Sequence, residues 1–121
     1  MDDFYKKSSV ITLIKTDFDN KKVVNKDFKN KNGLIVFYAP WCSHCQAMID
    51  MWKNIATTFK YRFIIGAVNV EDVDHDNGKL LKTFNISKYP TIKYVTKTGN
   101  VVKYTGVRTE DDLLFFIWNK M

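Results

Sequence analysis

The feature that most constrains this chain is an abrupt change of hydrophobic period before its middle. Residues 34–38, Leu-Ile-Val-Phe-Tyr, form a continuous apolar run without polar alternation. Such a run predicts a strand that is covered on both faces of a sheet. Pro40 closes the run, and beyond it the apolar residues recur with a helical period. We therefore expect a buried strand that leads almost directly into a helix.

One apolar stripe predicts the helix that follows. Its members are spaced i, i+3, i+4, i+7, i+8 and i+11, as on one buried helical face: Met48, Met51, Trp52, Ile55, Ala56 and Phe59. Cys42 and Cys45 stand between the strand and this stripe. The two cysteines must then lie on the turn into the helix and on its first turn.

Further strands and helices are predicted on both sides of this unit. Strands are expected at residues 10–14, 63–70, 91–96 and 101–104, the last two joined as a hairpin by the turn residues 98–100. A helix capped by Asp17 or Asp19 should bury Val24 and Phe28. A short helix should bury Leu80, Leu81 and Phe84. A capping box of Thr109 and Asp112 should open a last helix. The buried residues of this last helix should be Leu113, Leu114, Ile117 and Trp118.

The order of these elements, β-α-β-α-β-α-β-β-α, defines the expected fold class. Right-handed crossovers convert it into an α/β fold whose central mixed sheet is flanked by helices on both faces. The length of 121 residues corresponds to a single domain, residues 1–121. Residues 1–9 precede the first expected strand, and we expect them to form a flexible N-terminal segment.

Composition narrows the possible partners. The formal charge is +6, but the lysines are scattered from Lys6 to Lys120 without a basic cluster interleaved with aromatics, so we expect no nucleic-acid partner. No apolar stretch is long enough to span a bilayer, and we expect no membrane association and a monomer.

Location is inferred from the absence of a signal-peptide core in the first twenty residues, which predicts a cytoplasmic protein. A chain trimmed of its leader would look the same and would lie in the endoplasmic reticulum lumen. Abundant Lys and Asn with only two Arg indicate an AT-rich genome, such as those of some large DNA viruses and parasites, so a viral or virion-associated protein fits.

The cysteine pair is the chemical centre of the sequence. A thiol attacks a disulfide only as a thiolate, so an attacking cysteine needs surroundings that stabilise an anion. Cys42 is expected at a helix N-terminus, where unpaired backbone N–H groups favour negative charge, and His44 adds a donor or a positive charge. Cys45 follows one turn later, close enough to close a small disulfide ring.

Two other interpretations of the pair stay open at this point. A tetrahedral zinc site needs four ligands, and beyond Cys42, His44 and Cys45 only His75 remains, in a polar loop far along the chain. We therefore expect no metal. The pair could also be inert core cysteines, since an isolated Cys-x-x-Cys is a modest signal outside its strand-to-helix context.

Residues 37–45, Phe-Tyr-Ala-Pro-Trp-Cys-Ser-His-Cys, with Tyr89-Pro90-Thr91 later, resemble the catalytic domain of the protein disulfide isomerase branch of the thioredoxin superfamily. The resemblance runs from about Val10 to the C-terminus and implies a thioredoxin fold. It also implies a cis peptide bond at Tyr89–Pro90, in a loop beside Cys42 that pairs with an extended substrate. Trp41 would belong to the same docking surface. The alternatives are an ordinary trans turn at Pro90 and a core aromatic at Trp41.

Arg108 falls where this family carries an arginine that approaches the second cysteine. Such a cation would lower the pKa of Cys45 and help it act as the resolving thiolate. The alternative is a surface arginine near a helix start, a place that does not favour cations.

Three positions depart from the family pattern. Val36 stands where a buried acid usually relays the proton of the second cysteine, Gln46 replaces a lysine, and Ser43 replaces the glycine usual in isomerases. Proton transfer from Cys45 would then use water or another group.

These residues predict an enzyme that exchanges disulfides with protein substrates, in the manner of an oxidase or isomerase. Cys42 would attack, Cys45 resolve, His44 and Arg108 tune the sulfurs, and Trp41, Tyr89 and Pro90 dock the substrate. No cofactor is expected beyond the Cys42–Cys45 disulfide itself, and an unidentified thiol would donate or accept electrons. The alternatives are a cytosolic reductase and a non-catalytic protein-binding module of the same fold.

Overall fold

The central strand of the molecule is the one that the apolar run predicts. The computed structural model describes residues 4–121, and in it β4 (Gly33–Tyr38) has all six residues buried. It lies in the middle of a five-stranded sheet of order β1-β5-β4-β6-β7. Neighbouring strands pair with both of its edges, and its side chains are buried on both faces of the sheet. This burial explains why no polar residue interrupts the strand.

The sheet is mixed, as expected. β1 (Ile11–Thr12) and β4 are both parallel to β5 (Ile64–Asn69). On the other side, β6 (Thr91–Val95) runs antiparallel to β4 and forms a hairpin with β7 (Val101–Lys103). The parallel pairing brings the carboxyl end of β4, and the cysteines after it, to one end of the sheet.

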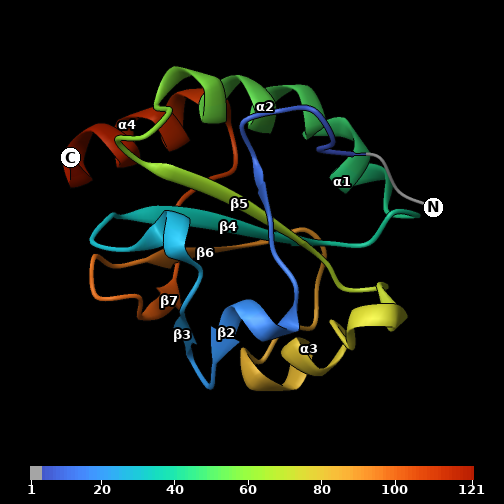
Figure 1. Ribbon diagram of the computed structural model, residues 1–121. Helices are drawn as coiled ribbons and strands as arrows, with labels where there is room; N and C mark the ends of the chain where they lie inside the picture. The colour runs from blue at the N-terminus through green and yellow to red at the C-terminus, as the bar shows by residue number, and fades with distance from the viewer. Residues whose placement is uncertain (1–3) are drawn as a thin grey trace.

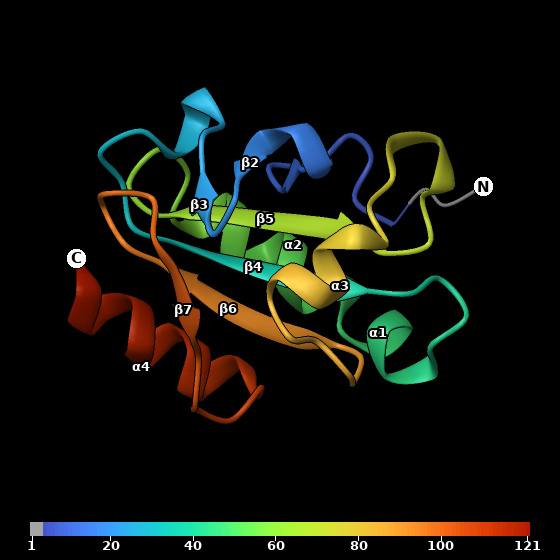
Figure 2. The same cartoon turned by 90° about the horizontal axis from the view of Figure 1, so that it is seen from below.

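Helices cover both faces of the sheet (Figures 1 and 2). α1 (Ser43–Ala47), α2 (Ile49–Thr58) and α4 (Glu110–Lys120) lie on one side, and α3 (Lys79–Thr83) lies on the other. Thr109 caps α4 as expected, because its hydroxyl accepts a hydrogen bond from the Asp112 N–H at 3.3 Å. None of the helices in residues 4–121 has the length and apolar character needed to cross a membrane.

The first predicted helix does not form. Between β1 and β4 the described chain has the 3₁₀ helices η1 (Lys15–Asp17) and η2 (Lys26–Phe28), with a hairpin of β2 (Phe18–Asp19) and β3 (Lys22–Val23) between them. Asp17 does not cap an α-helix but accepts hydrogen bonds from the Ile14 N–H at 2.9 Å and the Asn25 amide at 3.1 Å.

A hairpin forms here instead of a helix because the hairpin's backbone makes hydrogen bonds to another part of the fold that a helix would not make. Asn20 turns the chain with φ of 55°, and the Val23 N–H donates to the Gly99 carbonyl at 2.8 Å, in the turn between β6 and β7. The β-branched pair Val23 and Val24 also favours extended backbone. Val23 and Phe28 are buried, whereas Val24, expected inside, is 57% exposed.

Three smaller expectations also differ from the structure. The helix after Cys42 is interrupted at Met48, whose ψ of 3° ends α1 before α2 begins; no glycine or proline signals this break. Trp118 is 59% exposed, and its ring meets that of the buried Phe59 in an edge-to-face arrangement. In the segment expected to be flexible, Tyr5 is buried against Tyr38, and residues 1–3 lie outside the described part.

Two glycines on neighbouring strands make room for the ring of Phe28. A Cβ on Gly33 would stand 2.8 Å from this ring and 2.6 Å from the Ile64 carbonyl, and a Cβ on Gly66 would stand 3.0 Å from the ring. The Gly66 carbonyl accepts a hydrogen bond from the indole of the fully buried Trp52 at 3.0 Å. A large aromatic core is thus packed without an unpaired buried donor on the tryptophan.

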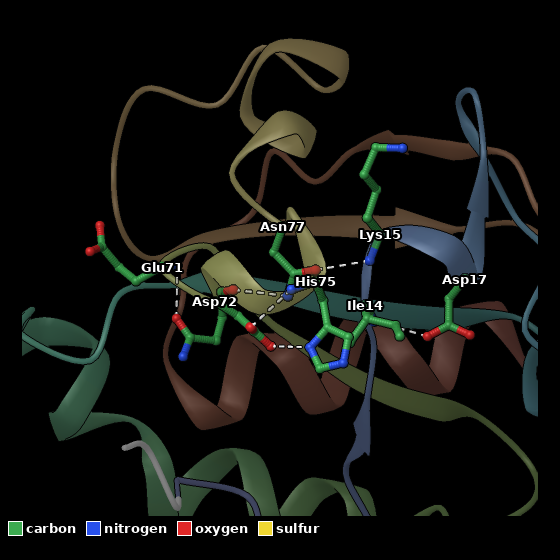
Figure 3. A network of polar contacts seen from close by, with 8 residues as sticks. Ile14, Lys15, Asp17, Glu71, Asp72, His75 and Asn77 are labelled. Carbon is green, nitrogen blue, oxygen red and sulfur yellow. Dashed lines mark hydrogen bonds and ion pairs between the residues drawn. The ribbon is translucent and has the colours of Figure 1, made fainter.

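A polar network fastens the loop that follows β5 (Figure 3). The buried side chain of Asn77 accepts from the Lys15 N–H at 2.9 Å and donates to the Asn69 carbonyl at 3.0 Å. Within the loop, the 3₁₀ helix η3 (Val73–His75) is capped by Asp72, whose carboxylate also meets the His75 ring at 2.8 Å. The loop is therefore tied to the segment between β1 and β2.

The packing of Phe28 leads to a stability prediction. Gly33→Ala should lower the free energy of unfolding by about 2 kcal/mol, since the new methyl meets a backbone carbonyl and a buried ring. Gly78→Ala is the matched control, because its Cβ would stand 3.6 Å from its nearest neighbour, the Val70 carbonyl oxygen, and its φ of −59° suits alanine. It should be neutral or stabilising by about 0.5 kcal/mol. Urea unfolding followed by circular dichroism measures both, and equal stabilities of the two variants would contradict the packing described.

Candidate active site

Cys42 occupies the N-cap of α1. Its backbone is extended, with φ of −82° and ψ of 118°, and its carbonyl accepts the first helical hydrogen bond from Gln46 at 3.0 Å. Its Sγ accepts a hydrogen bond from the Cys45 N–H at 3.3 Å, the contact that serine or aspartate usually makes at this position. A backbone donor is thus aimed at the sulfur, where it stabilises a thiolate more than a thiol.

The two sulfurs have different surroundings. Cys42 keeps 8% of its surface exposed and is preceded by the exposed Trp41, whereas Cys45 is 1% exposed. Burial raises the pKa of the Cys45 thiol to about 12, with the neighbouring Cys42 adding to the increase. The Ala39 backbone and the Arg108 guanidinium act in the opposite direction but do not outweigh burial. Cys45 is therefore held as a neutral thiol at physiological pH, and Cys42 is the more accessible of the two.

The loop before β6 lies against Cys42. The Tyr89–Pro90 peptide bond is cis, as the resemblance implied. The Cys42 thiol donates to the Tyr89 carbonyl across 3.6 Å. The ring of Trp41 meets the ring of Tyr89 edge to face, with centroids 5.8 Å apart. Trp41 is 65% exposed, so it is a surface residue beside the cysteine and not a core aromatic.

Arg108 is positioned by this same loop. Its guanidinium donates to the Pro90 carbonyl at 2.9 Å. The charge acts on Cys45 in the expected direction, lowering its pKa, but burial raises that pKa by more. The sequence could not show this balance, since the burial of Cys45 depends on how the helix packs on the sheet.

In the described part of the chain, His44 makes no hydrogen bond to either sulfur. Its ring is exposed on α1. It lines a groove of about 380 Å³ together with the following residues: Ala47, Met48, Met51, Pro90, Val107, Arg108 and Thr109. Any effect of His44 on the thiolate would act through space, from the wall of this groove.

The methionines of this groove are site residues that sequence reasoning missed. Both were assigned to the buried helical stripe, and Met51 is only half-buried.

Glu71 is a second residue that sequence reasoning missed. Burial raises the pKa of the Tyr89 phenol, and the charge of Glu71 adds to this increase. The carboxylate thus acts on the edge of the site. Its position in a polar loop after β5 gave no signal of this in the sequence.

The departures from the family pattern have structural consequences. Val36 is fully buried in β4, so this position offers no proton acceptor for Cys45. Gln46 instead fixes the turn before the helix, because its amide donates to the Pro40 carbonyl at 2.7 Å. In the described residues, no group of three or more His, Cys, Asp or Glu side chains is arranged to hold a metal ion.

A cysteine pair at a strand-to-helix turn, beside a cis proline on a mixed sheet, defines the thioredoxin class of thiol proteins. The family model for thioredoxin matches residues 7–119, and the chain belongs to this family. A solved structure of the first thioredoxin domain of mouse protein disulfide-isomerase A4 is 31% identical, with a TM-score of 0.69 over 92% of this chain and 74% of that one. Spinach chloroplast thioredoxin f shares the fold, with a TM-score of 0.72, 22% identity and 92% of each chain covered.

Curated relatives are protein disulfide isomerases. The chain is 36% identical over 116 residues to protein disulfide-isomerase erp38 of Neurospora crassa, covering 94% of this chain and 30% of that protein. It is 34% identical over 87 residues to protein disulfide isomerase-like 1-1 of Arabidopsis thaliana, covering 72% of this chain and 17% of that protein. The chain therefore spans less than a third of the length of either relative.

The unequal surroundings of the sulfurs predict unequal alkylation. In the reduced protein, iodoacetamide at pH 8 should modify Cys42 and leave Cys45 almost unmodified, because only about one in 10⁴ Cys45 side chains is a thiolate four pH units below its pKa. Peptide mass spectrometry after timed quenching measures both sites. Similar rates at the two cysteines would contradict the assignment of a buried neutral thiol to Cys45.

Proposed function

We propose that this chain is a protein disulfide isomerase-like thiol–disulfide oxidoreductase that exchanges disulfides with protein substrates. The observation that carries the proposal is the geometry of Cys42: its sulfur accepts the Cys45 N–H at 3.3 Å and lies 3.6 Å from the carbonyl of the cis Tyr89–Pro90 bond. An anion-stabilising donor and a peptide-docking loop thus meet at one sulfur. The family and the names of the relatives support the same activity.

The first step uses Cys42 as the nucleophile. Its thiolate forms a bond to one sulfur of a substrate disulfide, and the other substrate sulfur leaves as a thiolate that takes a proton from solvent. Trp41 and the Tyr89–Pro90 loop flank Cys42, and they would hold an extended substrate segment against it. The product of this step is a mixed disulfide between Cys42 and the substrate.

The second step uses Cys45 to release the substrate. The Cys45 thiol loses its proton and attacks the Cys42 sulfur, which closes a Cys42–Cys45 disulfide and expels the second substrate thiolate. The substrate gains two electrons and the cysteine pair loses two. Read backwards, the same steps oxidise a substrate dithiol, and an isomerisation returns the pair to its starting state.

Proton removal from Cys45 is the difficult part of this cycle. The pKa of about 12 leaves few thiolates at neutral pH, and Val36 provides no acceptor. Arg108 is the cation whose charge lowers this pKa. We infer that Arg108 is a positioning and tuning residue that assists the resolving step, while water accepts the proton.

A second candidate function is a protein-binding module with incidental turnover. The exposed ring of Trp41 beside Tyr89 and the buried Val36 favour it, since they keep a docking surface while weakening the second step. The two candidate functions predict different catalytic rates: an oxidoreductase accelerates disulfide exchange, whereas a binding module does not.

Reduction of insulin by dithiothreitol, followed by turbidity, separates the two candidates. The wild type should accelerate precipitation, and Cys42→Ala should return the rate to that of dithiothreitol alone, because no other sulfur in the site can attack. A wild type no faster than Cys42→Ala would favour the binding module. Refolding of scrambled ribonuclease then separates an isomerase, which restores activity, from a reductase, which does not.

The resolving step should depend steeply on pH. Well below a raised pKa the thiolate fraction of Cys45 grows about ten-fold per pH unit, so the rate of mixed-disulfide resolution should rise about 100-fold in all between pH 6 and pH 8. Stopped-flow measurement on a mixed disulfide between Cys42 and a chromogenic thiol follows this step. A rate independent of pH would show that another group takes the proton.

Replacement of Arg108 tests its part in the same measurement. Arg108→Met should slow resolution by about two- to five-fold, because an exposed cation is screened by solvent and salt. Arg108→Lys keeps the charge and should recover most of the rate. Equal losses in both variants would assign Arg108 to packing and not to electrostatics.

A further inference from the structure

A second concave site lies at the opposite end of the sheet from Cys42. It is a cavity of about 390 Å³ at the start of β5, lined by residues of the N-terminal segment, of η2 and of the C-terminal end of α2. Since β4 and β5 are parallel, their first residues lie at the end of the sheet away from the cysteines. The aliphatic and phenylalanine side chains of its lining are the half-buried Ile11 and the buried Ala56, Phe63, Ile64 and Ile65.

The rim of this basic cavity carries uncompensated positive charge. Lys26, Lys31 and Lys60 line it, and Asp27 is the one carboxylate in its lining. Across residues 4–121, no carboxylate lies within 4.0 Å of any of these three ammonium groups. Lys31 donates to the Tyr61 carbonyl at the rim. Three cations and one acid leave a net charge of +2 around one apolar hollow, which complements an anionic ligand.

Strand geometry indicates that a backbone donor also faces the cavity. The Ile64 N–H donates to the Asn32 carbonyl on the β4 side at 3.0 Å. Successive residues of a strand between two neighbours bond to alternate sides, so the N–H of Ile65 points to the opposite side. On that side β1 begins at Ile11, which pairs with Gly66, so the position opposite the Ile65 N–H precedes β1. This N–H therefore faces the region of the half-buried Ser9, which also lines the cavity.

We propose that the basic cavity binds a small amphipathic carboxylate. The apolar body of the ligand would lie against Ile11 and Ile64, the aliphatic lining residues that keep the most exposed surface, and its carboxylate would lie among the lysines. The volume is at the lower end of the roughly 300–1,000 Å³ usual for small-molecule sites. The site is independent of the proposed thiol chemistry, because it lies at the other end of the sheet.

Titration with decanoate, kept below its micellar concentration, tests the proposal on the ¹⁵N-labelled chain. Amide resonances of Ser9, Lys60 and Ile65 should shift saturably, and those of Trp41 and Cys42 should not move. Decanol supplies the same chain without charge, and acetate supplies the charge without the chain; both should bind at least ten-fold more weakly.

Charge variants provide the second arm of the test. The double variant Lys26→Gln/Lys60→Gln should weaken decanoate binding by about ten-fold, because it removes two of the three cations. Lys82→Gln removes one exposed charge outside the cavity and should bind like the wild type. Both variants alter exposed side chains and should keep the insulin-reduction rate of the wild type. Decanol that binds as tightly as decanoate, or decanoate affinity unchanged in the double variant, would overturn the proposal.

Discussion

The site depends on one hydrogen bond, from the Cys45 N–H to the Cys42 sulfur. It exists because β4 ends at Tyr38 and α1 begins at Ser43, so that Cys42 becomes the residue that caps the helix. The cap position gives its sulfur a backbone donor that an anion exploits better than a neutral thiol. The same turn places Cys45 on the inner side of α1, where it is buried. A single local geometry thus gives the two sulfurs different chemical characters.

That difference has a cost in the second half of the proposed cycle. Burial raises the pKa of Cys45 to about 12, and the buried Val36 supplies no base. Arg108 acts against burial, held by its hydrogen bond to the Pro90 carbonyl. The loop that contacts Cys42 through Tyr89 therefore also positions the cation that acts on Cys45. Attack and resolution are linked through one loop, in which Tyr89 faces the first sulfur and Pro90 holds the tuning charge.

Much of the fold and part of the site can be predicted from local sequence patterns. Hydrophobic period and residue spacing predict the apolar run of β4, the stripe around Trp52 and the cap at Thr109. These features are enough to predict the sheet and most of the helices. The hairpin at Asn20 could not be predicted, because its decisive bond joins Val23 to Gly99, far along the chain. The same limit applies at the site. Cys42, Cys45 and Pro90 belong to recognisable sequence motifs, whereas Met51 and Glu71 are brought to the site only by tertiary packing.

The central claim is that Cys42 attacks and Cys45 resolves, and trapping the intermediate tests it most directly. Cys45→Ala should accumulate a mixed disulfide with a peptide substrate, joined through Cys42, because the attacking sulfur is present and the releasing one is not. Cys42→Ala should accumulate none, since the remaining thiol is buried and neutral. Non-reducing mass spectrometry identifies the bonded cysteine. A stable adduct through Cys45 in the Cys42→Ala protein, at a rate matching that of the Cys45→Ala protein, would contradict the account.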